Sequence, residues 1–557
     1  MKVKWTTVGM VFFFVLSMVM TGCFIWQYKM TTLKTEVILE EVTVEEMCPR
    51  FPEPVLLRHP ITSLKVALEK VDMLLRSSVH TTKLPAISAI VVLNDSVLWN
   101  GNFGKKNISD PSSPAPNEYT VYRIASLSKI FPTLMLYKLW EDGLVDSLDD
   151  PFDKYTDNFT IKNPLGKNGG QASSSVRTYS SLTPALSLRR MASQLSGLPR
   201  RLRSTNLLWG GDTQAALNLL QDDVLVANPG TKCHYSNVAF SLLGNILAPK
   251  LANTDFETWV LDNILEKLSM EDTGFNITPA VQRQMALGVY SSGQPAPLYD
   301  LGWYRPAGQM YSTAADMAKL MMALLGAYGG TLLHQDTLNT MMTPVARCNS
   351  GYFANSTGTP WEINEQFGYN VVRKDGDLDG YTATLALVPR LKLGMVVLMA
   401  GVRPANQDLV SQAYSSLIPA VATAFKEAQR KLRSPPNPTP YVGFYTYRNM
   451  TFYDIKVGSD GVLVMQQFGP KVETIVLFNY KIIQLDYLQE RVFRVVLESP
   501  YPCKLKVNGA SVSLEAQDRQ LFNFYPFNKK GVSPGFDSPG LNTYKVTRIA
   551  GRPYFNK

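Results

Sequence analysis

Three short polar clusters occur in a fixed order along this chain and restrict the folds it can adopt. They are Ser126-Leu127-Ser128-Lys129, Tyr235-Ser236-Asn237 and Lys374-Asp375-Gly376. A Ser-x-x-Lys tetrapeptide alone is uninformative, because roughly two arise by chance in a chain of this length at ordinary residue frequencies. Three clusters in this order, each in a fitting local context, are much harder to obtain by chance. They indicate one site assembled from distant segments.

The segment after Ser126 is apolar at helical spacing. Residues 130–141 read IFPTLMLYKLWE, and Asp142-Gly143 ends the pattern. We therefore expect Ser126 at or near a helix N-terminus, with Lys129 one turn later on the same face. The helix dipole and a second cation would favour a neutral Lys129 amine, which can take the serine proton. The alternative is an ordinary capped helix, with Ser126 as N-cap and Lys129 in solvent.

Longer blocks around the clusters resemble the serine β-lactamase and penicillin-binding-protein superfamily, in particular its class C-like branch of esterases and D-amino-acid peptidases. The similarity spans roughly residues 61–424. It rests on YRIASLSKIFPTLMLYKLWEDGLVDSLDDPFDKY around Ser126, LSLRRMASQLSGLP, NPGTKCHYSNVAFSLLGNIL, RPAGQMYSTAADMAKLM and RKDGDLDGYTATLALVPRLKLGMVVLMAG. The resemblance implies an α/β (α+β) domain, in which helices flank an antiparallel sheet.

The resemblance also implies roles for the first two clusters. Ser126 resembles the acylated nucleophile, and Lys129 resembles the base that activates it. Tyr235 resembles a second proton carrier, which serves the leaving group as acid and deacylation as base. A tyrosine titrates near 10, so flanking lysines are needed for it to act as a phenolate. Asn237 resembles the residue that hydrogen-bonds the lysine and the substrate amide.

The third cluster resembles the family's Lys/His-x-Gly strand beside the cleft, with Lys374 and Gly376 as its matching residues. The oxyanion hole implied by the resemblance consists of the backbone N–H groups of Ser126 and Asp377. Asp375 and Asp377 depart from the family pattern. We expect them to disfavour a substrate carboxylate by like-charge repulsion, and to favour a neutral or cationic acyl substrate.

Two further departures lie near the clusters. Gln194 occupies a position where the family usually has His. Pro132 lies inside the helix expected to begin at Ser126, where it removes one N–H donor and is expected to kink the helix. Neither change removes a catalytic group. Together with Asp375 and Asp377, however, they leave open the alternative that the protein is a pseudoenzyme.

Three functions are compatible with these residues. The first is a serine hydrolase, an amidase or esterase that forms an acyl-Ser126 intermediate with a small-molecule or peptide substrate. The second is a catalytically silent protein whose cleft binds a peptide or lipid. The third is a scaffold at the membrane surface. Intact Ser126, Lys129, Tyr235 and Lys374 favour the first.

Cofactor, metal and nucleic-acid functions find no support in the sequence. The four histidines are isolated, without a metal-ligand spacing such as His-Glu-x-x-His, and no Gly-rich phosphate loop is present. The net charge of +9 comes from scattered residues, which indicates a solvated basic surface. We therefore expect no cofactor, no metal and no nucleic-acid partner.

The N-terminus is expected to enter a membrane. Residues 5–27 carry no charge and are long enough to cross a bilayer, and Lys2 and Lys4 precede them. We expect a signal anchor, with the N-terminus in the cytosol and the chain after the anchor luminal or extracellular. The alternative is a cleaved signal peptide and a secreted protein, because residues 11–20 are short enough for an h-region. Met20-Thr21-Gly22-Cys23 even resembles a bacterial lipobox.

Sequons and cysteines agree with an exported chain. The candidate glycosylation sites are Asn94, Asn107, Asn158, Asn276, Asn355 and Asn449. The cysteines beyond the membrane segment are Cys48, Cys233, Cys348 and Cys503. Four cysteines allow two disulfides in three connectivities, or they remain free buried thiols.

The remaining sequence suggests a domain order. The 557 residues, 45% hydrophobic, are enough for more than one domain. We expect a tail and anchor at 1–27, a stalk at 28–60, the hydrolase domain at 61–433, a linker at 434–440 and a C-terminal β domain at 441–557. Short alternating runs after 441 predict an antiparallel sandwich or barrel, and Tyr441-x-Gly-x-Tyr445 resembles the start of the lipocalin-like domain of some relatives.

Within the hydrolase domain, three local patterns stand out. Residues 61–79 predict a helix that packs on the sheet. Residues 86–104 predict two strands joined at Asn94-Asp95. Residues 162–182, rich in Gly and Ser, predict an insertion near the mouth of the cleft.

Overall fold

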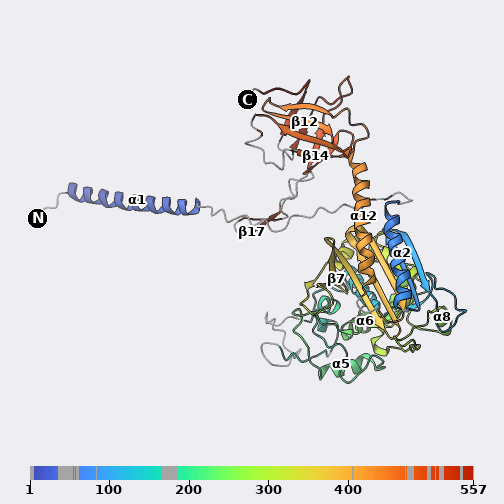
Figure 1. Ribbon diagram of the computed structural model, residues 1–557. Helices are drawn as coiled ribbons and strands as arrows, with labels where there is room; N and C mark the ends of the chain where they lie inside the picture. The colour runs from blue at the N-terminus through green and yellow to red at the C-terminus, as the bar shows by residue number, and fades with distance from the viewer. Residues whose placement is uncertain are drawn as a thin grey trace. The chain divides into compact units, whose positions relative to one another are not determined.

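The computed structural model describes most of the chain in two compact units (Figure 1). The larger unit is Phe51–Gln429, and the other comprises Met1–Arg50 and Arg430–Lys557. The described residues are 5–35, 54–55, 57, 62–82, 84–157, 159–165, 186–403, 407–470, 472, 482–497, 504–507, 510–513, 520–539 and 543–555. The insertion expected at 162–182 lies mostly outside them, as does most of the expected stalk.

An antiparallel sheet forms the centre of the larger unit, with the strand order β2-β1-β10-β9-β8-β7-β6-β5. Its strands are β1 (Ala86–Leu93), β2 (Ser96–Gly104), β5 (Ala346–Arg347), β6 (Ser356–Thr357), β7 (Glu362–Gln366), β8 (Tyr369–Leu378), β9 (Tyr381–Val388) and β10 (Leu393–Ala400). A separate short pair is β3 (Tyr122–Arg123) with β4 (Tyr311–Ser312). β1 and β10 are adjacent although about 300 residues separate them in sequence. The first and the last long strands of the domain therefore pair with each other.

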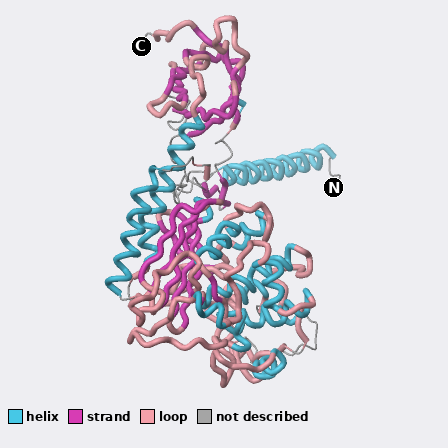
Figure 2. Tube along the Cα trace, turned by 90° about the vertical axis from the view of Figure 1, so that its right-hand side faces the viewer, coloured by secondary structure: helices cyan, strands magenta, loops and turns pink. Residues whose placement is uncertain are grey.

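Helices cover both faces of this sheet, and Figure 2 shows the strands between two helical layers. One face carries α2 (Thr62–Thr82) and α12 (Leu409–Arg433). The other face carries the remaining helices, some of which build the candidate site. They are η1 (Ala125–Lys129), α3 (Ile130–Glu141), η2 (Phe152–Lys154), α4 (Leu188–Ala192), α5 (Thr213–Gln221), α6 (Asn237–Ala252), α7 (Phe256–Val260), η3 (Leu261–Leu265), α8 (Pro279–Gln284), η4 (Gly302–Tyr304), α9 (Arg305–Gly308), α10 (Ala314–Leu324) and α11 (Gln335–Met341), and a short η5 (Pro389–Leu391) joins β9 to β10.

The apolar run of β1 explains why both faces are covered. Every residue of AISAIVVL is buried, with Ile87 and Val91 toward α2 and α12 and Ile90 and Val92 toward the opposite core. A strand that is apolar on both faces must be covered on both. The hairpin expected at Asn94 is confirmed, and Asn94 adopts the left-handed φ of 52° that its turn requires.

The helix expected at 130–141 is also confirmed, but its start corrects one expectation. Ser126 lies on the 3₁₀ helix η1, and the α-helix α3 begins only at Ile130. Pro132 is therefore the third residue of α3, within the first turn, where backbone N–H groups lack intrahelical partners. The expected interior kink was wrong because the helix starts later than Ser126.

The C-terminal part of the other unit is a closed antiparallel barrel, as expected. Its strands are β11 (Gly443–Tyr447), β12 (Thr451–Val457), β13 (Leu463–Phe468), β14 (Ile482–Gln489), β15 (Val492–Leu497), β18 (Leu521–Phe524), β19 (Gly535–Ser538) and β20 (Thr543–Ile549). β16 (Lys504–Val507) and β17 (Ala510–Ser513) form a separate hairpin. Aromatic rings, including Tyr445, Phe522 and Phe536, are buried inside the barrel and fill it.

The same unit contains one long N-terminal helix, α1 (Trp5–Thr35). Its segment Gly9–Gln27 has a mean hydropathy of 2.1 and none of it is buried, so it is long and apolar enough to cross a membrane. Both a membrane anchor and a signal sequence meet this description.

Candidate active site

The turn that carries Ser126 is held in a constrained conformation. Ala125 has a φ of 49°, a left-handed conformation that is costly for a residue with a Cβ. Ser126 is half-buried, whereas Leu127, Ser128 and Lys129 are buried. The Ser128 hydroxyl accepts the Met310 N–H at 3.1 Å and fixes the far side of the turn. The hydroxyl of Ser126 is therefore the one that remains partly accessible on this turn.

Lys129 is fully buried beside Ser126. Its Nζ lies 3.1 Å from Ser126 Oγ, 2.9 Å from Asn237 Oδ1 and 2.6 Å from the Ala307 carbonyl oxygen. Burial, which the repulsion of Lys374 reinforces, lowers the pKa of Lys129 to about 8. A neutral amine has two N–H donors and one lone pair. With the donors on Asn237 and Ala307, the lone pair is directed at the hydroxyl of Ser126.

Tyr235 approaches the same oxygen from the second cluster. Its hydroxyl lies 2.6 Å from Ser126 Oγ. The ring is within cation–π range of two lysines, with Lys129 Nζ at 4.8 Å and Lys374 Nζ at 5.4 Å from its centroid. Burial would raise the pKa of Tyr235, but the charges of Lys129 and Lys374 outweigh it and lower that pKa overall. Lys129 and Tyr235 therefore influence each other's pKa beside the Ser126 hydroxyl.

Glu362 belongs to this charge network, although the sequence analysis did not identify it. Its carboxylate contacts Lys374 Nζ, and both side chains are almost completely buried. Burial lowers the pKa of Lys374, but the attraction of Glu362, together with that of Tyr235 and Asp375, outweighs burial and raises the pKa, so the lysine remains charged. The only sequence signal was a Glu placed between the apolar residues Trp361 and Ile363. Antiparallel pairing of β7 with β8 brings it to Lys374.

Gln194 holds the Tyr235 segment at both ends. Its carbonyl oxygen accepts the His234 N–H at 2.8 Å, and its Oε1 accepts the Ser236 N–H at 2.7 Å. The φ of Gln194 is 61°, which allows its backbone and side chain to bond neighbouring residues. Ser236 then caps α6, because its hydroxyl accepts the Ala239 N–H. The Gln that departs from the family pattern is thus a positioning residue for Tyr235.

β8 passes close to the turn of Ser126 at Gly376. A Cβ on Gly376 would lie 2.6 Å from the Ile124 carbonyl oxygen and 2.7 Å from the Ser126 nitrogen. Only glycine permits this approach. The Asp375 N–H donates to Glu362 Oε2 at 3.1 Å, on the edge away from β9. Because N–H groups two residues apart leave a strand on the same side, the Asp377 N–H faces that edge as well.

The side chains of Asp375 and Asp377 do not lie beside Lys374. They alternate with Lys374 and Gly376 along β8 and face the α2 and α12 side, where they bond the cross-strand threonines Thr384 and Thr382. The expected repulsion of a substrate carboxylate was therefore wrong, because strand alternation directs these carboxylates to the other face of the sheet.

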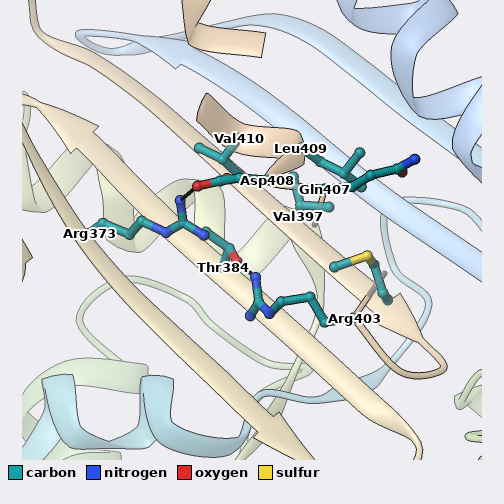
Figure 3. A pocket seen from close by; sticks show the side chains of 9 residues that line it. Arg373, Thr384, Val397, Arg403, Gln407, Asp408, Leu409 and Val410 are labelled. Atoms are coloured by element: carbon teal, nitrogen blue, oxygen red, sulfur yellow. Dashed lines mark hydrogen bonds and ion pairs between the residues drawn. The ribbon is translucent and has the colours of Figure 1, made fainter. Parts of the chain in front are cut away.

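Arginines neutralise the acidic groups on that face. Arg373 contacts Asp375 at 2.9 Å and Asp408 at 2.6 Å, and Arg403 contacts Asp377 at 3.3 Å. Figure 3 shows Arg373, Arg403 and Asp408 lining a small pocket between β8, β9 and the start of α12. Burial opposes ionisation of Asp375, but Arg373 and Arg403 hold its pKa below the ordinary value.

A disulfide joins the Tyr235 segment to a distant loop. Cys233 and Cys348 are bonded, which selects one pairing among those the sequence left open. Cys48 and Cys503 lie outside the described residues, and so does the sequon asparagine Asn158.

The other sequon asparagines lie on loops and turns of the described chain. Asn276, Asn355 and Asn449 are exposed, and Asn94 and Asn107 are half-buried. All five are at least partly accessible at the surface of their units.

Comparison with known proteins identifies the family. Residues 71–414 match the family model described as Beta-lactamase. Human beta-lactamase-like 1 is 56% identical over 509 residues, which cover 91% of this chain and 100% of the relative. Beta-lactamase-like protein 2 of Dictyostelium discoideum is 29% identical over 506 residues, 84% of this chain and 86% of the relative. The chain belongs to the beta-lactamase family, and this membership supports a serine-hydrolase type of site in general.

Solved structures agree on the fold. The octameric penicillin-binding protein homologue from Pyrococcus abyssi matches with a TM-score of 0.52 at 20% identity, covering 83% of this chain and 96% of that chain. The beta-lactamase/D-alanine carboxypeptidase from Yersinia pestis matches with a TM-score of 0.51 at 20% identity, covering 65% of this chain and 99% of that chain. At this identity the likeness concerns the fold alone.

Proposed function

We propose that this protein is a serine hydrolase that cleaves esters or amides through an acyl-Ser126 intermediate. One observation carries the proposal: Ser126 Oγ is contacted at once by Lys129 Nζ at 3.1 Å and by the Tyr235 hydroxyl at 2.6 Å. A hydroxyl between a buried amine with a lowered pKa and a tyrosine with a lowered pKa is set up for activation.

In acylation, the neutral amine of Lys129 takes the proton of Ser126 as Oγ attacks the substrate carbonyl carbon. The N–H groups of Ser126 and Asp377 are proposed to stabilise the resulting oxyanion. Tyr235 gives its proton to the leaving atom as the scissile bond breaks, and Lys129 returns a proton to Tyr235. The net change is transfer of the serine proton to the leaving group.

In deacylation, a water molecule replaces the leaving group. The Lys129–Tyr235 pair takes a proton from this water as its oxygen attacks the acyl carbon, and the proton returns to Ser126 Oγ as the ester bond breaks. Asn237 keeps Lys129 oriented throughout. Lys374 remains charged beside Glu362 and favours the phenolate form of Tyr235.

Covalent labelling tests this proposal. The purified domain after the N-terminal helix is treated with a fluorophosphonate and with a penicillin-type probe, beside a Ser126→Ala control. Labelling of the wild-type protein that disappears in Ser126→Ala supports an activated nucleophile. A folded wild-type protein that neither probe labels would exclude the hydrolase and leave a binding role.

We propose further that Gly9–Gln27 anchors the protein in a membrane, with the hydrolase domain luminal or extracellular. The Cys233–Cys348 disulfide and the accessible sequons are compatible with an oxidising, glycosylating compartment. Glycosidase treatment and protease protection of intact vesicles test this topology. An N-terminus that starts beyond the helix would instead identify a cleaved signal peptide.

The domain boundaries expected from the sequence are kept as part of this proposal: 1–27, 28–60, 61–433, 434–440 and 441–557. α12 ends at Arg433 and the first barrel strand begins at Gly443, which supports a linker between them. Limited proteolysis that cleaves within 434–440 would test the last two boundaries.

A further inference from the structure

Arg200 is an arginine at the candidate site without an acidic partner among the described residues. Lys374 is paired with Glu362, and Arg373 and Arg403 are paired with carboxylates on the other face of the sheet. Arg200 is exposed, and its guanidinium carbon lies 5.0 Å from the centroid of the Tyr235 ring. An exposed cation that touches the proton carrier is available to a substrate.

Hydrogen bonds of the backbone hold Arg200 at this position. The Arg200 carbonyl oxygen accepts the Asn237 N–H at 3.1 Å, and the preceding Pro199 carbonyl accepts the Ser236 hydroxyl at 2.8 Å. The segment that carries Arg200 is therefore bonded directly to the segment that carries Tyr235. Substitution of the Arg200 side chain leaves these backbone bonds in place.

The charge beside Tyr235 is positive. Burial lowers the pKa of His234, and the positive charge of Arg200 lowers it further, so this histidine adds no charge near neutral pH. The described carboxylate in direct contact with the network, Glu362, is already bound to Lys374. Arg200 thus contributes a free positive charge on the solvent side of Tyr235.

An aromatic surface lies against the same ring. Phe353 is 57% exposed, and its ring centroid lies 6.0 Å from that of Tyr235. Phe353 stacks on Tyr352 at 4.1 Å, and the Cys233–Cys348 disulfide ties their loop to the Tyr235 segment. A large apolar side chain that is fixed in place and exposed beside a reactive group is suited to contact an apolar group of a ligand.

We propose that Arg200 and Phe353 form a specificity subsite for a leaving group that carries both a carboxylate and an apolar side chain, as an acylated apolar amino acid does. Both residues touch Tyr235, the group that would protonate the leaving atom, so they flank the leaving group. This direction rests on the acyl-serine chemistry proposed above. It reverses the neutral or cationic preference expected from Asp375 and Asp377.

The reaction on such an amide is balanced by the residues already described. The bond from Ser126 Oγ to the acyl carbon forms as the carbon–nitrogen bond breaks. The serine proton passes through Lys129 and Tyr235 to the amine nitrogen. Water then releases the acyl group as a carboxylic acid and restores Ser126.

The test measures binding without turnover, in the full chain carrying Ser126→Ala. The probes are N-acetyl-phenylalanine, its neutral carboxamide and N-acetyl-alanine. Isothermal titration gives the affinity of each probe for Ser126→Ala alone and combined with Arg200→Gln, Arg200→Lys or Phe353→Ala. Arg203→Gln is the matched control, because the Arg203 side chain bonds the Asp222 carbonyl rather than Tyr235.

We expect the carboxylate probe to bind about 10- to 100-fold more tightly than the carboxamide, which is the usual worth of a charged hydrogen bond. Arg200→Gln should abolish this preference, Arg200→Lys should restore part of it, and Arg203→Gln should leave it intact. Phe353→Ala should reduce the preference for N-acetyl-phenylalanine over N-acetyl-alanine. Circular dichroism spectra recorded near neutral pH check that each variant is folded.

Equal binding of the carboxylate and carboxamide probes, or a preference that survives Arg200→Gln in a folded protein, would overturn the subsite. A carboxylate preference in a protein that fluorophosphonate does not label would keep the subsite and reject the hydrolase. Labelling of Ser126 without any carboxylate preference would do the reverse. The two proposals therefore fail in different experiments.

Discussion

Replacing Glu362 by Gln removes one charge from the buried pair and keeps its shape. The side chain of Lys374 is 1% exposed and that of Glu362 is 6% exposed, so the lysine cannot recover the lost attraction from water. The Gln carbonyl oxygen can still accept the Asp375 N–H that Glu362 accepts at 3.1 Å. Breaking a buried pair by removing one partner costs about 3 to 5 kcal/mol of unfolding free energy, and we expect this loss for Glu362→Gln.

The same substitution should change the pH dependence of labelling in a defined direction. The negative charge of Glu362 raises the pKa of both Lys129 and Tyr235. Without it, both groups lose their protons at lower pH. The acidic limb of Ser126 acylation, which the Lys129 pKa of about 8 would set in the wild-type protein, should therefore move to lower pH. The variant should be less stable but easier to activate in acid.

Urea denaturation and fluorophosphonate labelling across pH measure these two effects. Glu365→Gln is the control, because Glu365 lies on the same strand and is exposed. The double variant Glu362→Leu with Lys374→Met should recover most of the stability, since neither charge then remains buried. Unchanged unfolding free energy in Glu362→Gln, or an acidic limb that moves to higher pH, would refute this account of the network.

Three further predictions follow from single features of the site. The wild-type rate of Ser126 acylation should rise about tenfold per pH unit and level off above the Lys129 pKa of about 8, and a flat profile of the pseudo-first-order rate would contradict this. Gly376→Ala should abolish labelling, because its Cβ would lie 2.7 Å from the Ser126 nitrogen, and unchanged labelling of a folded variant would argue against the close approach. Replacing Cys233 and Cys348 by Ser should lower the free energy of urea unfolding by about 2 to 5 kcal/mol, because the bond closes a loop of 115 residues. The same change should slow labelling of Ser126. Equal stability of the variant and the wild-type protein would mean that the bond does not form.

Local patterns predicted local structure well. The apolar spacing of residues 130–141 gave the helix α3 with the same bounds, and the pair of runs in 86–104 gave β1 and β2 with a turn at Asn94. These elements depend on periodicity and turn residues that are adjacent in sequence. Only the assumption that this helix already begins at Ser126 was wrong, because the residues just before Ile130 form the separate 3₁₀ helix η1.

Side-chain direction was harder to predict. Asp375 and Asp377 were expected to face the substrate because they neighbour Lys374 in sequence. On a strand, however, neighbours point to opposite faces, and the register of β8 with β9 decides which face each residue takes. Gln194 was noted as a departure, but its bonds to His234 and Ser236 depend on its left-handed backbone.

The sequence by itself determined which chemical groups the protein has and the order in which they occur: a Ser-x-x-Lys turn before an apolar helix, a Tyr-Ser-Asn segment, and a strand with Lys and Gly. Only the tertiary structure decided which groups meet. It paired Lys374 with Glu362, Cys233 with Cys348, and the Tyr235 ring with Arg200. These contacts join segments that are separated in sequence, so their geometry depends on strand register and helix packing rather than on any local pattern.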